Sequence, residues 1–408
     1  MDTLLDRFCR YVRIETTADE NASSYPSSPG QWELAKLLLA ELRAIGLGDA
    51  TIDAHCIVRA TIPPTRPGAP AIAVLAHLDT SPEFTARDVK PIVHRNYAGG
   101  DIVLPGDRSK VIRTDESPEL ARLVGQTLVT SDGTTLLGAD DKAGVAVIMT
   151  AAAELVARRD ILHGPIHIIF TCDEEIGRGV DRLDVRSIDA ACAYTFDGES
   201  AGAIETETFS ADRATVTITG RNIHPGLATG RMVNALRIAG QFVARLPWQR
   251  LAPETTSGRD GFLHPYVIEG GVARATLGVL LRSFETADLA RQADILRAIA
   301  ATLAPEHPGC RIDVDVRNQY RNMRDGLARE PRAVAIAEQA IRNVGLTPVF
   351  RAIRGGTDGS RLTELGLATP NLFAGMHNFH SPLEYACLEE MELSVRVLVE
   401  LARLWGSQ

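Results

Sequence analysis

The stretch Ala-Ile-Ala-Val-Leu-Ala-His-Leu-Asp, residues 71–79, joins a short apolar run to two polar side chains. A continuous apolar run of this length is typical of a strand buried on both faces of a sheet. His77 and Asp79 follow at an i, i+2 spacing, which puts both side chains on one side of an extended backbone. Because ligand sites in α/β sheets form beyond the carboxyl ends of strands, the stretch predicts a buried strand with a site at its end. A strand-end turn with a solvated aspartate is the alternative.

Around this stretch, helical and strand-like patterns alternate. Helical spacing of apolar residues predicts helices at 2–13, 31–45 and 142–156, and apolar runs predict strands at 165–171 and 190–196. Strands separated by helices favour an α/β fold with a mixed, mostly parallel sheet flanked by helices. The polar segment 81–133 interrupts the pattern, and we expect a functional loop there.

A second pattern begins near Phe209. Residues 213–219 and 311–316 alternate between polar and apolar side chains, 266–281 contains strand-like runs, and 233–246 and 287–303 are expected to be helices. We therefore predict an inserted α+β domain at 209–320, with 1–208 and 321–408 forming the domain that carries the site.

The amino-acid composition of the chain argues against several classes of binding partner. The chain has 408 residues, a formal net charge of −9 and 5% aromatic residues, which argues against a nucleic-acid partner. Its six cysteines form no CxxC pair and are expected in a reducing compartment. The N-terminus lacks the pattern of a signal peptide, and no apolar stretch reaches the length of a membrane span. A cytoplasmic location without a membrane partner is expected.

Further metal-type ligands lie at other predicted strand ends and at one helix start. They are Asp140 and Asp141 before the helix, the Cys-Asp-Glu-Glu run at 172–175, Asp197 after the strand 190–196, and His380. Each has a simpler explanation: a helix cap, a solvated turn or a structural histidine. His377 competes with His380 for the same role.

Taken together, these positions indicate a metal site. Two histidines and at least four carboxylates form a mixed nitrogen and oxygen donor set, which suits zinc, manganese or cobalt. The number of ligands suffices for two ions that share a carboxylate. HExxH, GxSxG and GxxxxGK[ST] motifs do not occur, so single-zinc helix proteases, serine hydrolases and P-loop enzymes lose support.

At these residues the sequence resembles the M20 metallopeptidase family, and within it the tripeptide aminopeptidases. The matching segments are 77–82, 137–144, 173–177, 222–226 and 354–359, together with the long insertion that carries 96–102. Their order and spacing also match, and the resemblance covers essentially the whole chain. It implies a fold of the zinc-exopeptidase type, in which 209–320 is a lid.

The resemblance implies a ligand set for two Zn²⁺ ions, with Co²⁺ or Mn²⁺ as substitutes. His77 and Asp197 would hold one ion, Glu175 and His380 the other, and Asp140 would bridge both. The Asp140–Asp141 peptide bond would be cis. Two further residues would serve the chemistry of a bound water: Glu174 as general base and then acid, and Asp79 as acceptor of the second ring N–H of His77.

The resemblance implies a substrate-binding role for His224 in the lid, and two arginines, Arg282 in the lid and Arg354 in 321–408, are further candidates. His224 would stabilise the tetrahedral intermediate, either when the lid closes or across a homodimer. Arg282 or Arg354 could clamp a substrate carboxylate. The simpler interpretations are a loop histidine for His224 and a surface ion pair for Arg282. The acid in Gly198-Glu199-Ser200 departs from the family pattern and leaves side-chain preference open.

The expected activity is hydrolysis of the N-terminal peptide bond of a tripeptide, with a short peptide as the partner. A dipeptidase or an N-acyl-amino-acid deacylase on the same scaffold is the first alternative. A metal-loaded peptide-binding protein without turnover is the second, and Glu174 argues against it because binding alone needs no general base.

Overall fold

The computed structural model describes residues 2–408 and divides into two compact units. The first unit comprises residues 2–206, Met323–Arg351 and Thr357–Gln408, and the second comprises Glu207–Asn322 and Ala352–Gly356. The predicted division at 208/209 and 320/321 lies within two residues of the observed one. The short return of the chain to the second unit at Ala352–Gly356 was not predicted.

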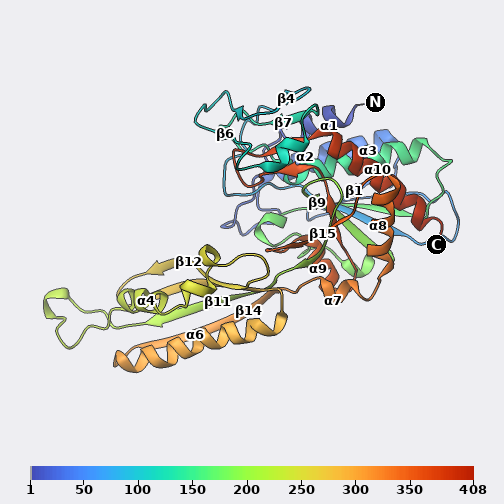
Figure 1. Cartoon of the computed structure of the whole chain (residues 1–408). Helices are drawn as coiled ribbons and strands as arrows, with labels where there is room; N and C mark the ends of the chain where they lie inside the picture. The colour runs from blue at the N-terminus through green and yellow to red at the C-terminus, as the bar shows by residue number, and fades with distance from the viewer. Residues whose placement is uncertain (1) are drawn as a thin grey trace. The chain divides into compact units, whose positions relative to one another are not determined.

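The first unit is built on a mixed eight-stranded sheet (Figure 1). Its strands, in spatial order, are β1 (Thr51–Ile52), β2 (Val58–Ile62), β8 (Ile166–Thr171), β3 (Ile72–His77), β9 (Cys192–Gly198), β16 (Asn371–Phe373), β10 (Ala203–Thr208) and β15 (Val349–Ile353). The four central strands, β8, β3, β9 and β16, pair in parallel, whereas β1–β2, β2–β8 and β16–β10 are antiparallel. The fold is therefore α/β, as the sequence predicted.

The central strand β3 shows why its sequence is apolar throughout. Ile72, Val74 and Ala76 face the main hydrophobic core, and Ala73 and Leu75 face a second core on the other side of the sheet. The helices that contribute several residues to the main core are α1 (Leu4–Tyr11), α2 (Pro29–Ile45), α3 (Ala139–Ala157), α8 (Arg332–Asn343) and α10 (Leu388–Trp405). On the other face lie α9 (Asp358–Glu364) and the segment around Val180. The short helix α7 (Arg324–Leu327) contacts α9. Burial on both faces is the predicted environment of β3.

The segment 81–133 is not the unbroken loop that the sequence predicted. It contains β4 (Ile92–His94), the hairpin β5 (Ile102–Val103) and β6 (Val111–Ile112), and β7 (Leu128–Thr130). Near the C-terminus, β17 (Met376–His377) and β18 (Tyr385–Cys387) complete a small sheet of order β17-β18-β7-β4. Strands of two or three residues are too short to show a period, so sequence patterns did not reveal them. This sheet ties the segment to the loop that carries His380.

The second unit is a four-stranded antiparallel sheet with two helices packed on it. The strand order is β12 (Phe262–Gly270), β13 (Arg274–Ser283), β11 (Ser210–Thr219) and β14 (Arg311–Tyr320). The helices α4 (Ala235–Ala244) and α6 (Thr286–Glu306) bury their apolar faces on this sheet. The short helix α5 (Trp248–Leu251) lies between α4 and β12 in the chain. Among residues 2–408, no helix combines the length and apolar composition that a membrane span requires.

Helix α3 approaches β9 closely because residue 144 is glycine. A Cβ atom at Gly144 would lie 1.9 Å from the Phe196 carbonyl oxygen and 2.4 Å from Asp141 Oδ1. Contacts this short would force the helix away from the strand.

We therefore expect Gly144→Ala to lower the free energy of unfolding by about 1–3 kcal/mol, the usual cost of overpacking. The midpoint of thermal unfolding, followed by circular dichroism, measures the effect. Gly240→Ala is the control, because Gly240 is also helical but a Cβ atom there would have no neighbour within 4 Å. Alanine should stabilise that site by about 0.5–1 kcal/mol. Equal effects of the two changes would contradict the packing argument.

Candidate metal centre

The predicted metal-type ligands converge at the carboxyl edge of the central sheet. His77 is the last residue of β3, Asp197 lies at the end of β9, and Glu174 and Glu175 follow β8. Asp140 stands at the start of α3, and its backbone angles and those of Asp141 are not helical. Gly138 precedes them with a left-handed φ of 78°. The Asp140–Asp141 peptide bond is cis, as the family resemblance implied.

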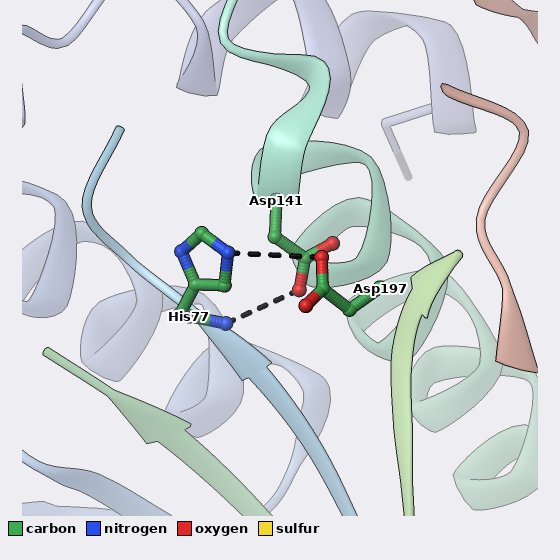
Figure 2. Close-up of side chains that lie close together, drawn as sticks. All are labelled: His77, Asp141 and Asp197. Carbon is green, nitrogen blue, oxygen red and sulfur yellow. Dashed lines mark hydrogen bonds and ion pairs between the residues drawn. The ribbon is translucent and has the colours of Figure 1, made fainter. Parts of the chain in front are cut away.

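Asp140 lies between the two histidines. Its Oδ1 is 2.9 Å from His77 Nε2, and its Oδ2 is 3.3 Å from His380 Nε2. On one side, His77 Nε2 is also 3.7 Å from Asp197 Oδ1 (Figure 2). On the other side, His380 Nε2 is 2.8 Å from Glu175 Oε2. The two oxygens of the Asp140 carboxylate thus face two different pairs of donors. One pair is His77 with Asp197, and the other is His380 with Glu175.

Asp141, a metal-type side chain for which the resemblance implied no ligand role, completes a potential ligand group with His77 and Asp197. Figure 2 shows its carboxylate beside these two side chains. Its oxygens accept backbone N–H bonds from His77, at 3.2 Å, and from Gly144, at 3.1 Å. Asp141 therefore joins the end of β3 to the start of α3. The pair of adjacent aspartates was the only sign of it in the sequence.

Asp79 holds the turn that carries the two glutamates. Its Oδ1 and Oδ2 accept the backbone N–H groups of Glu174 and Glu175, each at 3.0 Å. The resemblance implied that the second ring nitrogen of His77 donates to Asp79, and the structure shows which oxygen of Asp79 is nearer. Nδ1 lies 3.1 Å from the Asp79 carbonyl oxygen and 3.6 Å from the carboxylate. The carboxylate is already engaged by the two amides, so the carbonyl is the nearer acceptor.

Burial of so many acids at one edge changes their protonation. Burial raises the pKa of Asp197 to about 7, and the neighbouring Asp140 carboxylate acts in the same direction. Burial likewise raises the pKa of Glu175 to about 8 and that of Glu174 well above its ordinary value. Although burial opposes it, hydrogen bonds to Asp140 and Glu175 raise the pKa of His380 to about 11.

These residues fit a bound cation. Glu175 Oε1 is buried and has no hydrogen-bond partner among the described residues. A buried carboxylate oxygen without a donor is costly unless a metal ion occupies the position. The surrounding donors are imidazole nitrogens and carboxylate oxygens, the set that borderline divalent metals prefer.

His377, the competitor of His380, is occupied elsewhere. Its Nε2 lies 2.6 Å from Glu390 Oε2, and its ring stacks on Tyr385 with centroids 4.7 Å apart. The structure therefore brings His380, and not His377, to the carboxylate cluster.

The three predicted substrate residues belong to the second unit. His224 is exposed and accepts the N–H of Gly226 at 3.2 Å through Nδ1. Arg282 is buried, contrary to a surface ion pair, and donates to the carbonyl oxygens of Asp212 and Leu281.

Arg354 is likewise engaged within its own unit. It donates to the carbonyl oxygens of Gly258 and Asp260, each at 2.8 Å. Its guanidinium also lies over the rings of Phe209 and Phe262. Both arginines thus hold backbone of the second unit in this structure.

The fold and the donor set together define the class of α/β metallohydrolases. The family description that matches the sequence is "Peptidase family M20/M25/M40", over residues 131–404. Two curated relatives, both named peptidase T, match nearly the full chain. The protein of Geobacillus kaustophilus is 45% identical over 98% of both chains. That of Bacillus subtilis is 42% identical over 100% of this chain and 99% of its own. The chain therefore belongs to the M20/M25/M40 peptidase family.

Solved structures share the fold. An aminopeptidase from Bacillus cereus superimposes with a TM-score of 0.75 at 24% identity, over 99% of this chain and 98% of its own. A tripeptidase from Staphylococcus aureus gives 0.76 at 23% identity over the same shares. A dinuclear metal-binding M20 peptidase from Bacillus subtilis gives 0.65 at 16% identity, over 98% and 97%.

The two histidines provide a direct test of the ligand geometry. We expect His380→Gln to lose one of two bound metal ions per chain, because His380 Nε2 lies 2.8 Å from Glu175 Oε2, within hydrogen-bond distance of that carboxylate. His377→Gln should retain both, since its ring is bound to Glu390. Inductively coupled plasma mass spectrometry after dialysis measures the stoichiometry. Metal loss in the His377 variant alone would contradict this assignment.

Proposed function

We propose that the chain is a two-metal aminopeptidase that hydrolyses the N-terminal peptide bond of tripeptides. The observation that carries the proposal is the position of Asp140, with one carboxylate oxygen toward His77 and the other toward His380. The names of the relatives, peptidase T, support the same activity.

In this proposal His77 and Asp197 would hold the first metal, Glu175 and His380 would hold the second, and Asp140 would serve both. Zinc is the proposed ion, with cobalt or manganese as substitutes, because nitrogen and oxygen donors suit all three. When bound, two such ions lower the pKa of a shared water and stabilise charge on the scissile carbonyl oxygen.

Glu174 is the proposed general base. Its backbone N–H is fixed by Asp79, so its side chain leaves from a rigid turn beside the ligand Glu175. It would accept the proton of the attacking water and then deliver that proton to the leaving amine, so that one group serves both steps. Asp79 acts as a positioning residue: it orients His77 through its carbonyl oxygen and the turn through its carboxylate.

The second unit is proposed as the lid. His224 would stabilise the tetrahedral intermediate, and Arg282 and Arg354 would bind the substrate carboxylate, which requires that they release part of their present backbone contacts. We propose that this unit and the segment 81–133 limit peptide length, and that a homodimer is compatible with the role of His224. A cytoplasmic location is supported by the six cysteines, all of which are free.

A series of di-, tri- and tetrapeptides with one shared N-terminal residue tests the function. We expect release of that residue from the tripeptide, loss of release with a chelator, and recovery with zinc, cobalt or manganese. Glu174→Gln should lower kcat by about 10²–10⁴-fold, the usual contribution of general acid–base catalysis. Glu154→Gln, which removes only an exposed ion pair with Arg158 on α3, is the control.

Two results would redirect the proposal. Equal cleavage of longer peptides would remove the length limit. Cleavage of N-acylated amino acids without cleavage of any free peptide would make the chain a deacylase with the same metal centre.

A further inference from the structure

Glu384 is a buried acid whose role the sequence did not indicate. It follows His380 by four positions and is 1% exposed. It lies close enough to Asp140 for the two negative charges to interact unfavourably. A buried carboxylate near other carboxylates requires strong hydrogen bonds to remain charged.

The carboxylate of Glu384 holds the backbone on either side of Ala139. Its Oε2 accepts the N–H of Gly138 at 2.7 Å, and its Oε1 accepts the N–H of Asp140 at 3.0 Å. The first N–H groups of a helix have no partner within the helix. Glu384 supplies that partner at the point where the chain turns to present Asp140.

The backbone of Glu384 is hydrogen-bonded within the loop that carries His380. The Glu384 N–H donates to the Ser381 carbonyl oxygen at 3.1 Å, which closes a tight turn directly after His380. Asn378, on the other side of His380, donates to Ser117 Oγ at 2.9 Å. The chain then enters β18, which pairs with β7. The loop is thus anchored at both ends by the 81–133 segment.

These contacts connect Glu384, Asp140 and His380 to one another. Glu384 binds the backbone of Asp140, the Asp140 carboxylate lies 3.3 Å from His380 Nε2, and His380 leads through the tight turn back to Glu384. Two donors of the proposed second metal are therefore connected through a residue that is not itself a donor.

We propose that Glu384 is a positioning residue that sets the separation of Asp140 and His380 and thereby the affinity of the second metal. The inference rests on the proposed metal centre but not on the proposed substrate. It also gives the 81–133 segment a second role, because that segment supports the His380 loop through β7 and Ser117.

The chemistry of Glu384 requires two acceptor oxygens. Glutamine has nearly the same shape but replaces one oxygen by an NH₂ group, which would face a backbone N–H. Aspartate keeps the charge but is shorter by one methylene, so its carboxylate cannot span both amides at their present positions.

The test is cobalt binding to the full chain, freed of metal and then titrated with Co²⁺. The visible absorption of bound cobalt reports ligand geometry, and competition with a chelator gives affinity. We expect Glu384→Gln to weaken the binding of one of two cobalt ions by about 10–100-fold, the usual effect of removing a residue that orients a ligand. Its absorption spectrum should change as well.

Glu389→Gln is the matched control. Glu389 also accepts a backbone N–H, that of Thr127 at 2.8 Å, but contacts none of the proposed ligands in any described interaction. We expect wild-type cobalt affinity and spectrum for this variant. A purely structural effect of losing an acid-to-amide bond would appear in both variants.

Wild-type cobalt affinity and spectrum in Glu384→Gln would overturn the proposal. If that variant does not fold, Glu384→Asp is measured in the same way, with weaker binding of one cobalt ion expected and unchanged binding overturning the proposal. Since the titration contains no peptide, failure to cleave tripeptides would count against the proposed function and leave this result unaffected.

Discussion

The repulsion among carboxylates buried at one sheet edge is the constraint on which the site depends. Asp140, Glu174, Glu175 and Asp197 meet there, and burial together with the charge of neighbouring carboxylates raises the pKa of the last three. Bound cations would remove this cost, because opposite charge favours ionised acids. The parallel strands bring the acids to this edge, and bound cations would offset the cost of assembling them there.

A second set of acids keeps the first in place through backbone amides. Each member accepts N–H bonds from segments that carry the proposed ligands or the general base and so fixes the main chain, and Asp141 in addition lies in a potential ligand group with His77 and Asp197. The members are Asp79, Asp141 and Glu384. Asp173 adds a related bond by accepting from Ser27 and Gln31 beneath the same turn. The acidic residues near this centre thus include proposed metal ligands and residues whose carboxylates accept backbone N–H groups.

Sequence patterns predicted the sheet and the convergent donors because both follow from strand ends: an apolar run that stops at His77 must place it at the sheet edge. The second set of acids was harder to predict. Glu384 is one acid in a loop, and only the tertiary fold brings it to the amide of Asp140. The small sheet within 81–133 escaped prediction because its strands are too short to show a period. The burial of Arg282 depends on its neighbours in the folded second unit, which its position in the sequence does not reveal.

The most direct test is anomalous X-ray diffraction from zinc-loaded crystals of the full chain. Two peaks are predicted, about 3.5–4 Å apart as in other two-metal sites, each in contact with one carboxylate oxygen of Asp140. One should lie beside His77 and Asp197, and the other beside Glu175 and His380. A single peak, or peaks that do not share Asp140, would contradict the bridged two-metal centre.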